Sequence, residues 1–165
     1  MGTRSRPYRP GRSRLGSGVG GQQSCRAVSV ILFDTHVLIW FADGDPRLGK
    51  VAGNTVADAI GSGEALFAAI SMWEIGMLVA RRNVTLAMPP EIWIERLVEV
   101  GLVIADMTRQ IALDAGSLPR EIHGDPCDRI IMATARAYNC PLLTADTRLL
   151  DYGREGRLKA IDARR

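Results

Sequence analysis

Short, continuous apolar runs alternate with longer segments of helical spacing along most of the chain. Continuous runs rich in Val, Ile and Leu are typical of strands that are buried on both faces of a parallel sheet. Four such strands are predicted at residues 28–33, 65–70, 101–107 and 140–145, with a fifth, at the edge of the sheet, at 157–161. The alternation begins abruptly at residue 28 and continues almost to the last residue.

The segments between these runs have the spacing and the boundary residues of helices. Helices are predicted at residues 35–42, 50–63, 71–82, 89–100, 108–118, 126–139 and 147–153. Ser71 and Glu74 have the spacing of a capping box, with Ser71 as the N-cap of the third helix. Strands that alternate with helices predict an α/β fold, a three-layer α/β/α sandwich around a central, mainly parallel sheet of four or five strands.

Residues 1–27 are rich in Arg, Gly, Ser and Pro and contain little that a core could bury. We expect this segment to be disordered and residues 28–165 to form one folded domain. The segment lacks the apolar centre of a secretory signal. It is either an arm that attracts RNA nonspecifically or upstream sequence included by an early start site, and the abrupt start of the apolar pattern favours the second interpretation.

The net charge of +3 comes from this N-terminal segment. Six of the 21 basic residues lie within residues 1–27, which contain no acid, whereas all 18 acidic residues lie in the rest of the chain. The domain is therefore mildly acidic, which argues against nucleic-acid binding through one broad basic face. No apolar run approaches the ~20 residues that span a bilayer. The three cysteines, Cys25, Cys127 and Cys140, lack metal-like spacing, so we expect a reduced, cytoplasmic protein.

Two acidic residues, Asp34 and Asp146, each follow a predicted strand directly. Open α/β sheets bind their ligands at the carboxyl ends of parallel strands, so both side chains are candidates for a site there. Asp34 is also a good N-cap for the helix that follows it, and taken alone that role is favoured. Thr144, two residues before Asp146, can add a hydroxyl to the same edge.

Three further acids lie near helix starts that converge on this edge. Asp125 precedes Pro126, and proline favours the first helical position, so Asp125 is predicted to cap its helix and to support the site from behind. Asp128 then occupies the third helical position, where its side chain is free to point into a site. Glu74 is predicted in the first turn of its helix, with a capping role and a site role both open.

Four carboxylates, those of Asp34, Glu74, Asp128 and Asp146, are thus predicted at one edge of one sheet. They repel one another unless a cation lies among them. Oxygen ligands favour Mg²⁺, with Mn²⁺ as a substitute and water molecules completing the octahedron. Zinc is disfavoured because neither histidine has suitable spacing to another nitrogen or sulfur ligand. Of the two, His36 is expected at the rim of the site, close to Asp34, and His123 is expected to be an ordinary polar residue.

Over residues 29–161 the chain resembles a PIN-domain ribonuclease, and most closely the VapC-type toxins of bacterial toxin–antitoxin pairs. The resemblance is carried by four segments in a specific order and at specific intervals, LFDTHVLIW, SMWEIGMLV, HGDPCDRIIMATA and LLTADTRLL. The metal-binding acids of the family correspond here to Asp34, Glu74, Asp128 and Asp146. His36 departs from the pattern, because many members carry Asn or Ser at that position.

The resemblance implies a Mg²⁺-dependent endoribonuclease in which a metal-activated water attacks the phosphodiester. It implies three main metal ligands, Asp34, Asp128 and Asp146. Glu74 would either complete the site or receive the proton of the water. The arginines Arg129 and Arg148 are candidates for phosphate contact, and Arg81 and Arg82 are candidates for the RNA path. Solvated helix ends explain these four arginines equally well.

The resemblance also implies protein partners, namely a small cognate antitoxin and a second copy of the chain in a homodimer, and no membrane. Three apolar segments at 37–42, 72–80 and 92–98 contain all three tryptophans and more large apolar side chains than one small sheet easily covers. We expect part of this surface to form a groove for an antitoxin segment whose basic side chains reach the acids. Core packing is the alternative, and it is favoured for each tryptophan taken alone.

Two other functions remain open from the sequence. A phosphatase or phosphotransferase with an aspartyl nucleophile has a similar start to ILFD, but such enzymes generally need a second Asp two residues later, where this chain has His36. A PIN-fold interaction protein without catalysis would be marked by the loss of an acid, and all four acids are present.

Overall fold

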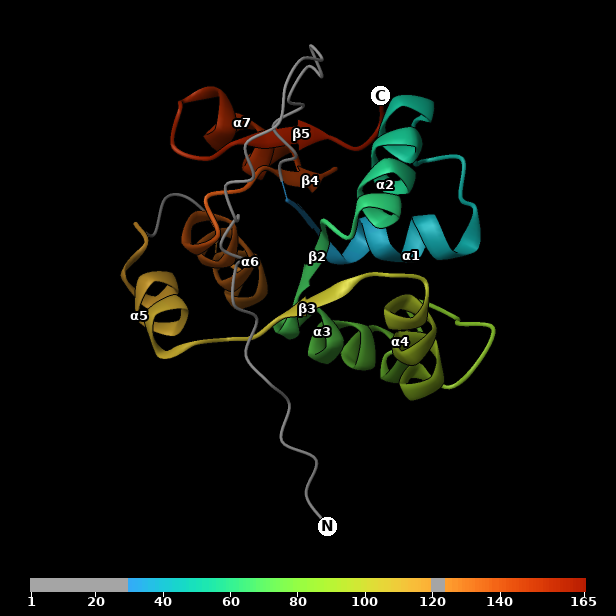
Figure 1. Ribbon diagram of the computed structural model, residues 1–165. Helices are drawn as coiled ribbons and strands as arrows, with labels where there is room; N and C mark the ends of the chain where they lie inside the picture. Colours follow the sequence, from blue (N-terminus) through green and yellow to red (C-terminus); the bar gives the residue numbers. More distant parts are fainter. Residues whose placement is uncertain (1–29, 120–123) are drawn as a thin grey trace, which may run out of the picture.

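The computed structural model describes residues 30–119 and 124–165. The predicted N-terminal segment 1–27, Cys25 and His123 lie outside these residues. The described part contains five strands and seven helices (Figure 1). In chain order they are β1 (Ile31–Phe33), α1 (Thr35–Asp43), α2 (Lys50–Ser62), β2 (Ala65–Ala68), α3 (Ala69–Ala80), α4 (Pro90–Glu99), β3 (Val103–Ala105), α5 (Arg109–Ser117), α6 (Pro126–Ala137), β4 (Leu142–Thr144), α7 (Thr147–Arg154) and β5 (Ala160–Asp162).

The five strands form one sheet in the order β3-β2-β1-β4-β5, and every pairing is parallel. The predicted α/β fold is therefore confirmed, including the edge strand β5. From the central strand β1 the chain first builds outward through β2 and β3. It then returns to place β4 on the other side of β1. The strand order therefore reverses between β1 and β4. Parallel α/β sheets bind their ligands in the crevice at such a reversal.

Alternate side chains along the central strands enter two separate cores. Phe33, Phe67 and Leu143 pack on one face with residues of α1, α2 and α4. Leu32 and Leu66 pack on the other face with residues of α6 and α7. This alternation is the two-residue period of a strand, and both faces are apolar because helices cover both. In Figure 1, α5 and α6 lie on one side of the sheet and α1 and α2 on the other.

The predicted start of the third helix is wrong. Helix α3 begins at Ala69, with Ala68 in the N-cap position and no side-chain cap, so Ser71 lies inside the first turn. Ser71 is fully buried, and its hydroxyl contacts the side chain of Thr35. The predicted capping box is therefore absent, because a side chain from another helix takes up the Ser71 hydroxyl. As a consequence β2 ends at Ala68, two residues earlier than predicted.

Other boundaries differ from the prediction by a few residues. The third strand is confined to Val103–Ala105, because Gly101 adopts a left-handed turn with φ of 110° just before it. Cys127 and Cys140 are buried free thiols. No helix within 30–119 or 124–165 is long and apolar enough to span a membrane.

Candidate active site

Asp34 follows β1 directly and lies at the point where the strand order reverses. It occupies the N-cap position of α1 with an extended backbone, but its side chain makes no capping hydrogen bond. The carboxylate is 4% exposed. Its Oδ2 accepts a hydrogen bond of 2.5 Å from the Thr144 hydroxyl at the end of β4. The capping role that the sequence favours for Asp34 is therefore not the role of its side chain, which is held inside the crevice.

Thr144 connects the two strands that border the crevice. Its hydroxyl donates to Asp34 and accepts a hydrogen bond of 3.0 Å from the backbone N–H of Asp146. The residue is completely buried. The hydroxyl that the sequence suggested for this edge thus fixes the positions of two acids relative to each other.

Asp146 follows β4 and caps α7. Its Oδ1 accepts hydrogen bonds of 2.7 Å from the N–H of Arg148 and 3.2 Å from the N–H of Leu149. The half-buried carboxylate also raises the pKa values of Asp34 and Asp128 by charge repulsion. Asp146 is therefore both a helix cap and a member of the acidic group.

The two acids at the start of α6 occupy the positions that helix geometry predicts. Asp125 is the N-cap, and its Oδ1 accepts a hydrogen bond of 2.7 Å from the N–H of Cys127. Asp128 lies in the first turn of the helix. The rest of α6 is packed against the sheet through Ile131 and Met132, which are fully buried and hold the first turn in place.

Glu74 reaches the group from α3, where it lies in the second turn and not the first. Its Oε2 accepts a hydrogen bond of 2.6 Å from the Thr35 hydroxyl. Burial raises the pKa of Glu74, the bond from Thr35 opposes this shift, and repulsion from Asp34 adds to it. A carboxylate that burial and a like charge both disfavour is typical of a functional site.

The pKa of Asp128 is also perturbed by this group of acids. Burial raises its pKa to about 8, and Asp34, Asp125, Asp146 and Glu74 all contribute through repulsion. Burial also raises the pKa of Asp34, whereas the hydrogen bond from Thr144 and the electrostatic effect of His36 lower it. The four predicted acids therefore share one electrostatic environment, with His36 exposed at its rim as expected.

The carboxylates are not gathered closely enough to surround a metal ion. Within 30–119 and 124–165, no three Asp, Glu, His or Cys side chains lie close enough together to hold a metal ion. Hydroxyl and backbone donors instead hold Asp34, Glu74 and Asp146 in place. Carboxylate oxygens that repel one another are nevertheless the donors that suit a hard divalent cation.

Comparison with known proteins gives the family. A family model for the PIN domain matches residues 31–155. Ribonuclease VapC22 of Mycobacterium tuberculosis is 34% identical over 125 residues, which is 76% of this chain and 93% of that protein. The chain belongs to the PIN-domain family, as a VapC-type ribonuclease toxin.

Two solved structures have the same fold as this VapC-type PIN domain. A toxin–antitoxin complex from Klebsiella pneumoniae contains a chain that aligns with a TM-score of 0.54 and 22% identity, over 81% of this chain and 97% of that one. VapBC2 from Rickettsia felis, bound to a DNA fragment from its promoter, aligns with a TM-score of 0.56 and 15% identity, over 79% and 96% of the two chains. VapC-type PIN nucleases are typically metal-dependent.

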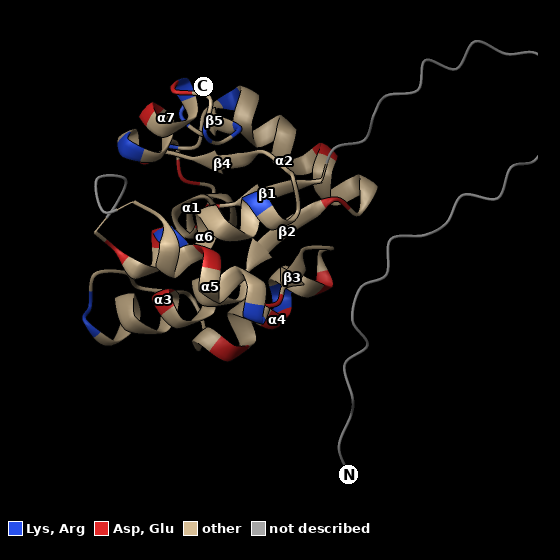
Figure 2. Ribbon diagram, turned by 90° about the vertical axis from the view of Figure 1, so that its left-hand side faces the viewer, with Lys and Arg blue, Asp and Glu red and all other residues tan. Residues whose placement is uncertain are grey.

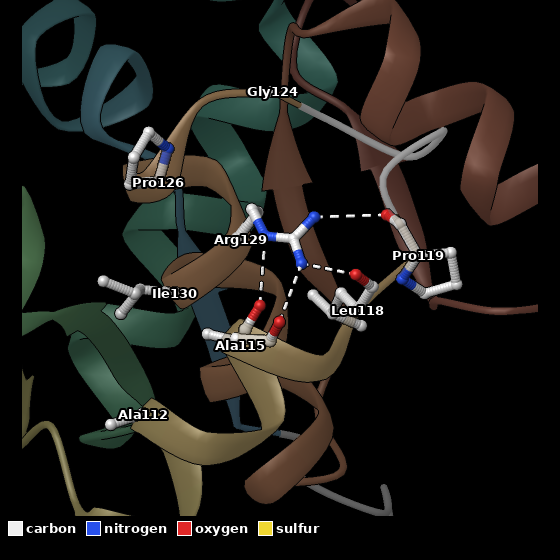
Figure 3. A pocket seen from close by; sticks show the side chains of 9 residues that line it. Ala112, Ala115, Leu118, Pro119, Gly124, Pro126, Arg129 and Ile130 are labelled. Atoms are coloured by element: carbon white, nitrogen blue, oxygen red, sulfur yellow. Dashed lines mark hydrogen bonds between the residues drawn. The ribbon is translucent and has the colours of Figure 1, made fainter.

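Arg129 of the PIN domain is engaged in a different contact from the one suggested by the sequence. Its guanidinium lies beside a hollow of about 900 Å³ between α5 and α6 and donates to four backbone carbonyls in the last turn of α5 and just beyond it (Figure 3). These belong to Ala115 at 3.0 Å, Pro119 at 3.1 Å, Gly116 at 3.4 Å and Leu118. Arg129 therefore ties the end of α5 to α6, and this contact does not support the suggested role in binding phosphate.

The other candidate arginines of the PIN domain are exposed. Arg148 follows the Asp146 cap in the first turn of α7, next to the acidic group. Arg81 and Arg82 lie just beyond the end of α3, and Arg82 has a left-handed backbone with φ of 59°. Arg148 thus keeps a position suited to phosphate contact, while Arg81 and Arg82 have the positions of solvated residues at a helix end.

Sequence reasoning missed the two hydroxyls that support Glu74. Thr35 directly follows Asp34, and Ser71 lies three residues before Glu74, so both belong to the segments that carry the family resemblance. Their contact joins α1 to α3 across 36 positions in the chain. The only signal in the sequence was the spacing of Ser71 and Glu74, which also fits a capping box.

Proposed function

We propose that this PIN domain is a Mg²⁺-dependent endoribonuclease that hydrolyses RNA phosphodiester bonds as the toxin of a toxin–antitoxin pair in the cytoplasm. The observation that carries the proposal is the gathering of four mutually repelling carboxylates from β1, α3, α6 and β4 in one crevice, which helps to raise the pKa of Asp128 to about 8. Such a group gains stability when a divalent cation replaces protons. Mn²⁺, a hard cation of similar ligand preference, is expected to substitute for Mg²⁺.

The cation would be held by Asp34, Asp128 and Asp146. When bound, it would supply a water of lowered pKa and offset the negative charge on the phosphate. Because these carboxylates are separately held, the proposal requires them to close around the ion. Thr144 keeps Asp34 and Asp146 in fixed relation during this change, since it bonds to both residues.

Glu74 would receive the proton of the attacking water. Its carboxylate is half-buried, its pKa is raised by burial, and it is held by Thr35 at the edge of the acidic group. A base with a raised pKa accepts a proton more readily than an ordinary carboxylate. Arg148 is the nearest exposed arginine along the chain to Asp146, and it would contact a phosphate beside the scissile one.

The test is cleavage of a labelled RNA by the purified chain, with Mg²⁺, with Mn²⁺ and with a chelator. We expect cleavage with either metal and none with the chelator. DNA of the same sequence and a chromogenic phosphate monoester are the matched controls. Cleavage of the monoester alone would favour the aspartyl phosphatase, and Mg²⁺ binding without any cleavage would favour a catalytically silent PIN-fold protein.

An antitoxin partner is supported by apolar surface on α3 and α4. Of the three tryptophans, Trp40 and Trp93 are buried in the core, as core packing predicts, and do not contribute to this surface. Trp73 is 59% exposed on α3, and Ile92 and Val98 are exposed on α4, which packs against α3. We propose that a segment of a small cognate antitoxin covers this surface, with basic side chains extending to the acids.

A homodimer is also proposed, since Met107 and Leu113 expose further apolar surface around α5. Co-expression with the neighbouring small reading frame and sizing by light scattering test both partners. We expect a complex with the product of that frame, and a dimer when the toxin is alone. A chain that stays monomeric and binds no such product would remove the toxin role and leave the nuclease.

A further inference from the structure

We propose that Ser71 and Thr35 form a hydrogen-bonded relay that positions the carboxylate of Glu74 for the reaction. The proposal rests on the nuclease function proposed above and assigns two positioning residues to it. Both hydroxyls are completely buried. Neither contacts the phosphate or the attacking water, so they would act through Glu74.

The direction of the relay follows from the number of protons available. The Thr35 Oγ1 lies 2.6 Å from Glu74 Oε2 and 2.9 Å from Ser71 Oγ. A hydroxyl has one proton to donate, and an ionised carboxylate can only accept. Thr35 therefore donates to Glu74, the shorter and charge-assisted bond, and the contact with Ser71 is completed by the Ser71 proton. The order of donation is Ser71 to Thr35 to Glu74.

The relay spans two helices and is fixed at both ends. Ser71 and Glu74 are three residues apart on α3, so their side chains share one face of that helix. Thr35 is the first residue of α1, next to Asp34. Hence the same short segment that ends β1 holds one acid directly and a second acid through its hydroxyl.

A fixed donor is needed because Glu74 lies near another negative charge. Asp34 and Glu74 repel each other, and both are poorly solvated. Without a donor, the Glu74 carboxylate would be expected to turn toward solvent, away from Asp34. The bond from Thr35 offsets this repulsion, while Ser71 orients the Thr35 hydroxyl so that its proton points at Glu74.

Three variants and one control test the relay. Thr35→Val removes the donor with little change of shape, Thr35→Ser restores it, and Ser71→Ala removes only the first member. Thr134→Val is the matched control, because Thr134 is equally buried but donates to the backbone carbonyl of Ile130 at 2.7 Å, inside α6. Cleavage kinetics, Mg²⁺ affinity by calorimetry and melting temperature are measured for each.

We expect Thr35→Val to lower kcat by roughly 10- to 100-fold with little change of KM for RNA. It should also weaken Mg²⁺ binding, because a Glu74 carboxylate that turns toward solvent no longer holds its negative charge beside the cation. Thr35→Ser should recover most of the kcat and most of the Mg²⁺ affinity. Ser71→Ala should have values between those of Thr35→Val and the wild type. Thr134→Val should have a lower melting temperature but the kcat and Mg²⁺ affinity of the wild type. Wild-type kcat and Mg²⁺ affinity in Thr35→Val would overturn the relay, as would equal losses in Thr134→Val.

If Thr35→Val does not fold, Ser71→Ala provides the test. In that variant the Thr35 hydroxyl can still bond to Glu74, but Ser71 no longer orients it. Wild-type kcat in Ser71→Ala would then overturn the relay. Failure of the wild-type chain to cleave RNA would instead overturn the proposed function. In that case crystal structures of the wild type and Ser71→Ala still test the relay, which requires the Glu74 carboxylate to move when Ser71 is truncated.

Discussion

Asp34 and Asp146 occupy equivalent positions after two neighbouring strands, but their side chains have different surroundings. Asp34 is buried and receives a hydroxyl from Thr144, whereas Asp146 is half-buried and caps α7. Position in the chain predicted that both would reach the crevice, because the carboxyl ends of parallel strands share one edge. It could not predict which backbone or hydroxyl donors each acid would meet, since those depend on packing between distant segments.

The pH dependence of stability provides a prediction at the residue scale. In the folded chain the pKa of Asp128 is raised from 3.8 to about 8. The folded state therefore keeps a proton that the unfolded chain releases, so stability is expected to fall as the pH rises from about 4 to about 8 and to level off above that. Melting temperatures in a chelator over this range measure the effect.

Asp128→Asn should make this decline smaller and should melt higher than the wild type above about pH 8. Part of the decline should persist, because the pKa values of Asp34 and Glu74 are also raised. An equally steep decline in Asp128→Asn would show that Asp128 titrates normally in the folded chain.

At the scale of elements, helix starts decide how the site is assembled. Proline at the first position of α6 made the Asp125 cap and the first-turn position of Asp128 predictable, and both residues are found there. The start of α3 was not predictable in the same way. Its N-cap is an alanine, and the serine that looked like a cap bonds to a threonine of another helix. Local signals identify an element boundary only when no tertiary contact competes for the same side chain.

Arg129 provides a prediction for the α5–α6 pair. Its guanidinium bonds to four carbonyls, two in the last turn of α5, where carbonyls have no partner within the helix, and two just beyond it. Hydrogen bonds from a charged group contribute about 1.5–3 kcal/mol, so Arg129→Met is expected to destabilise the domain by about 2 kcal/mol. For a chain of this size that corresponds to a fall in melting temperature of roughly 4–8 °C.

Arg148→Met is the matched comparison for Arg129, because Arg148 is exposed in the first turn of α7. It should leave the melting temperature nearly unchanged and weaken RNA binding instead. The reverse pattern, a stable Arg129→Met with poor RNA binding, would return Arg129 to the phosphate contact first suggested by its position.

For the whole molecule, the distribution of charge indicates where RNA lies. Six basic and three acidic residues fall within residues 147–165, whereas acids outnumber bases in the rest of the described chain. Figure 2 shows Lys and Arg on α7 and around the C-terminus. A hollow of about 480 Å³ between the ends of α6 and α7, just before β5, is lined by Arg136, Arg157 and Lys159. The overall composition does not reveal the basic C-terminal part, because basic residues of the N-terminal segment dominate the net charge.

This distribution predicts that the surface formed by α7 and β5 contacts phosphates of the substrate. RNA affinity is measured at several salt concentrations in the Asp128→Asn background, to avoid cleavage. Replacing Arg157 and Lys159 by Gln should reduce the slope of log affinity against log salt by about one per residue. Arg96→Gln, at an exposed and ion-paired position on α4, is the control and should leave the slope unchanged. Equal slopes in all variants would place the RNA elsewhere.

The central claim is that Asp128 holds the metal while Asp125 only caps α6, and cleavage rates of two conservative variants test it most directly. Asp125→Asn should cleave RNA at close to the wild-type rate, because asparagine caps a helix about as well as aspartate. Asp128→Asn should lose Mg²⁺-dependent cleavage while folding at least as stably, because the amide removes a charge that the cation needs and the other acids repel. Wild-type cleavage by Asp128→Asn, or a folded but inactive Asp125→Asn, would contradict the account.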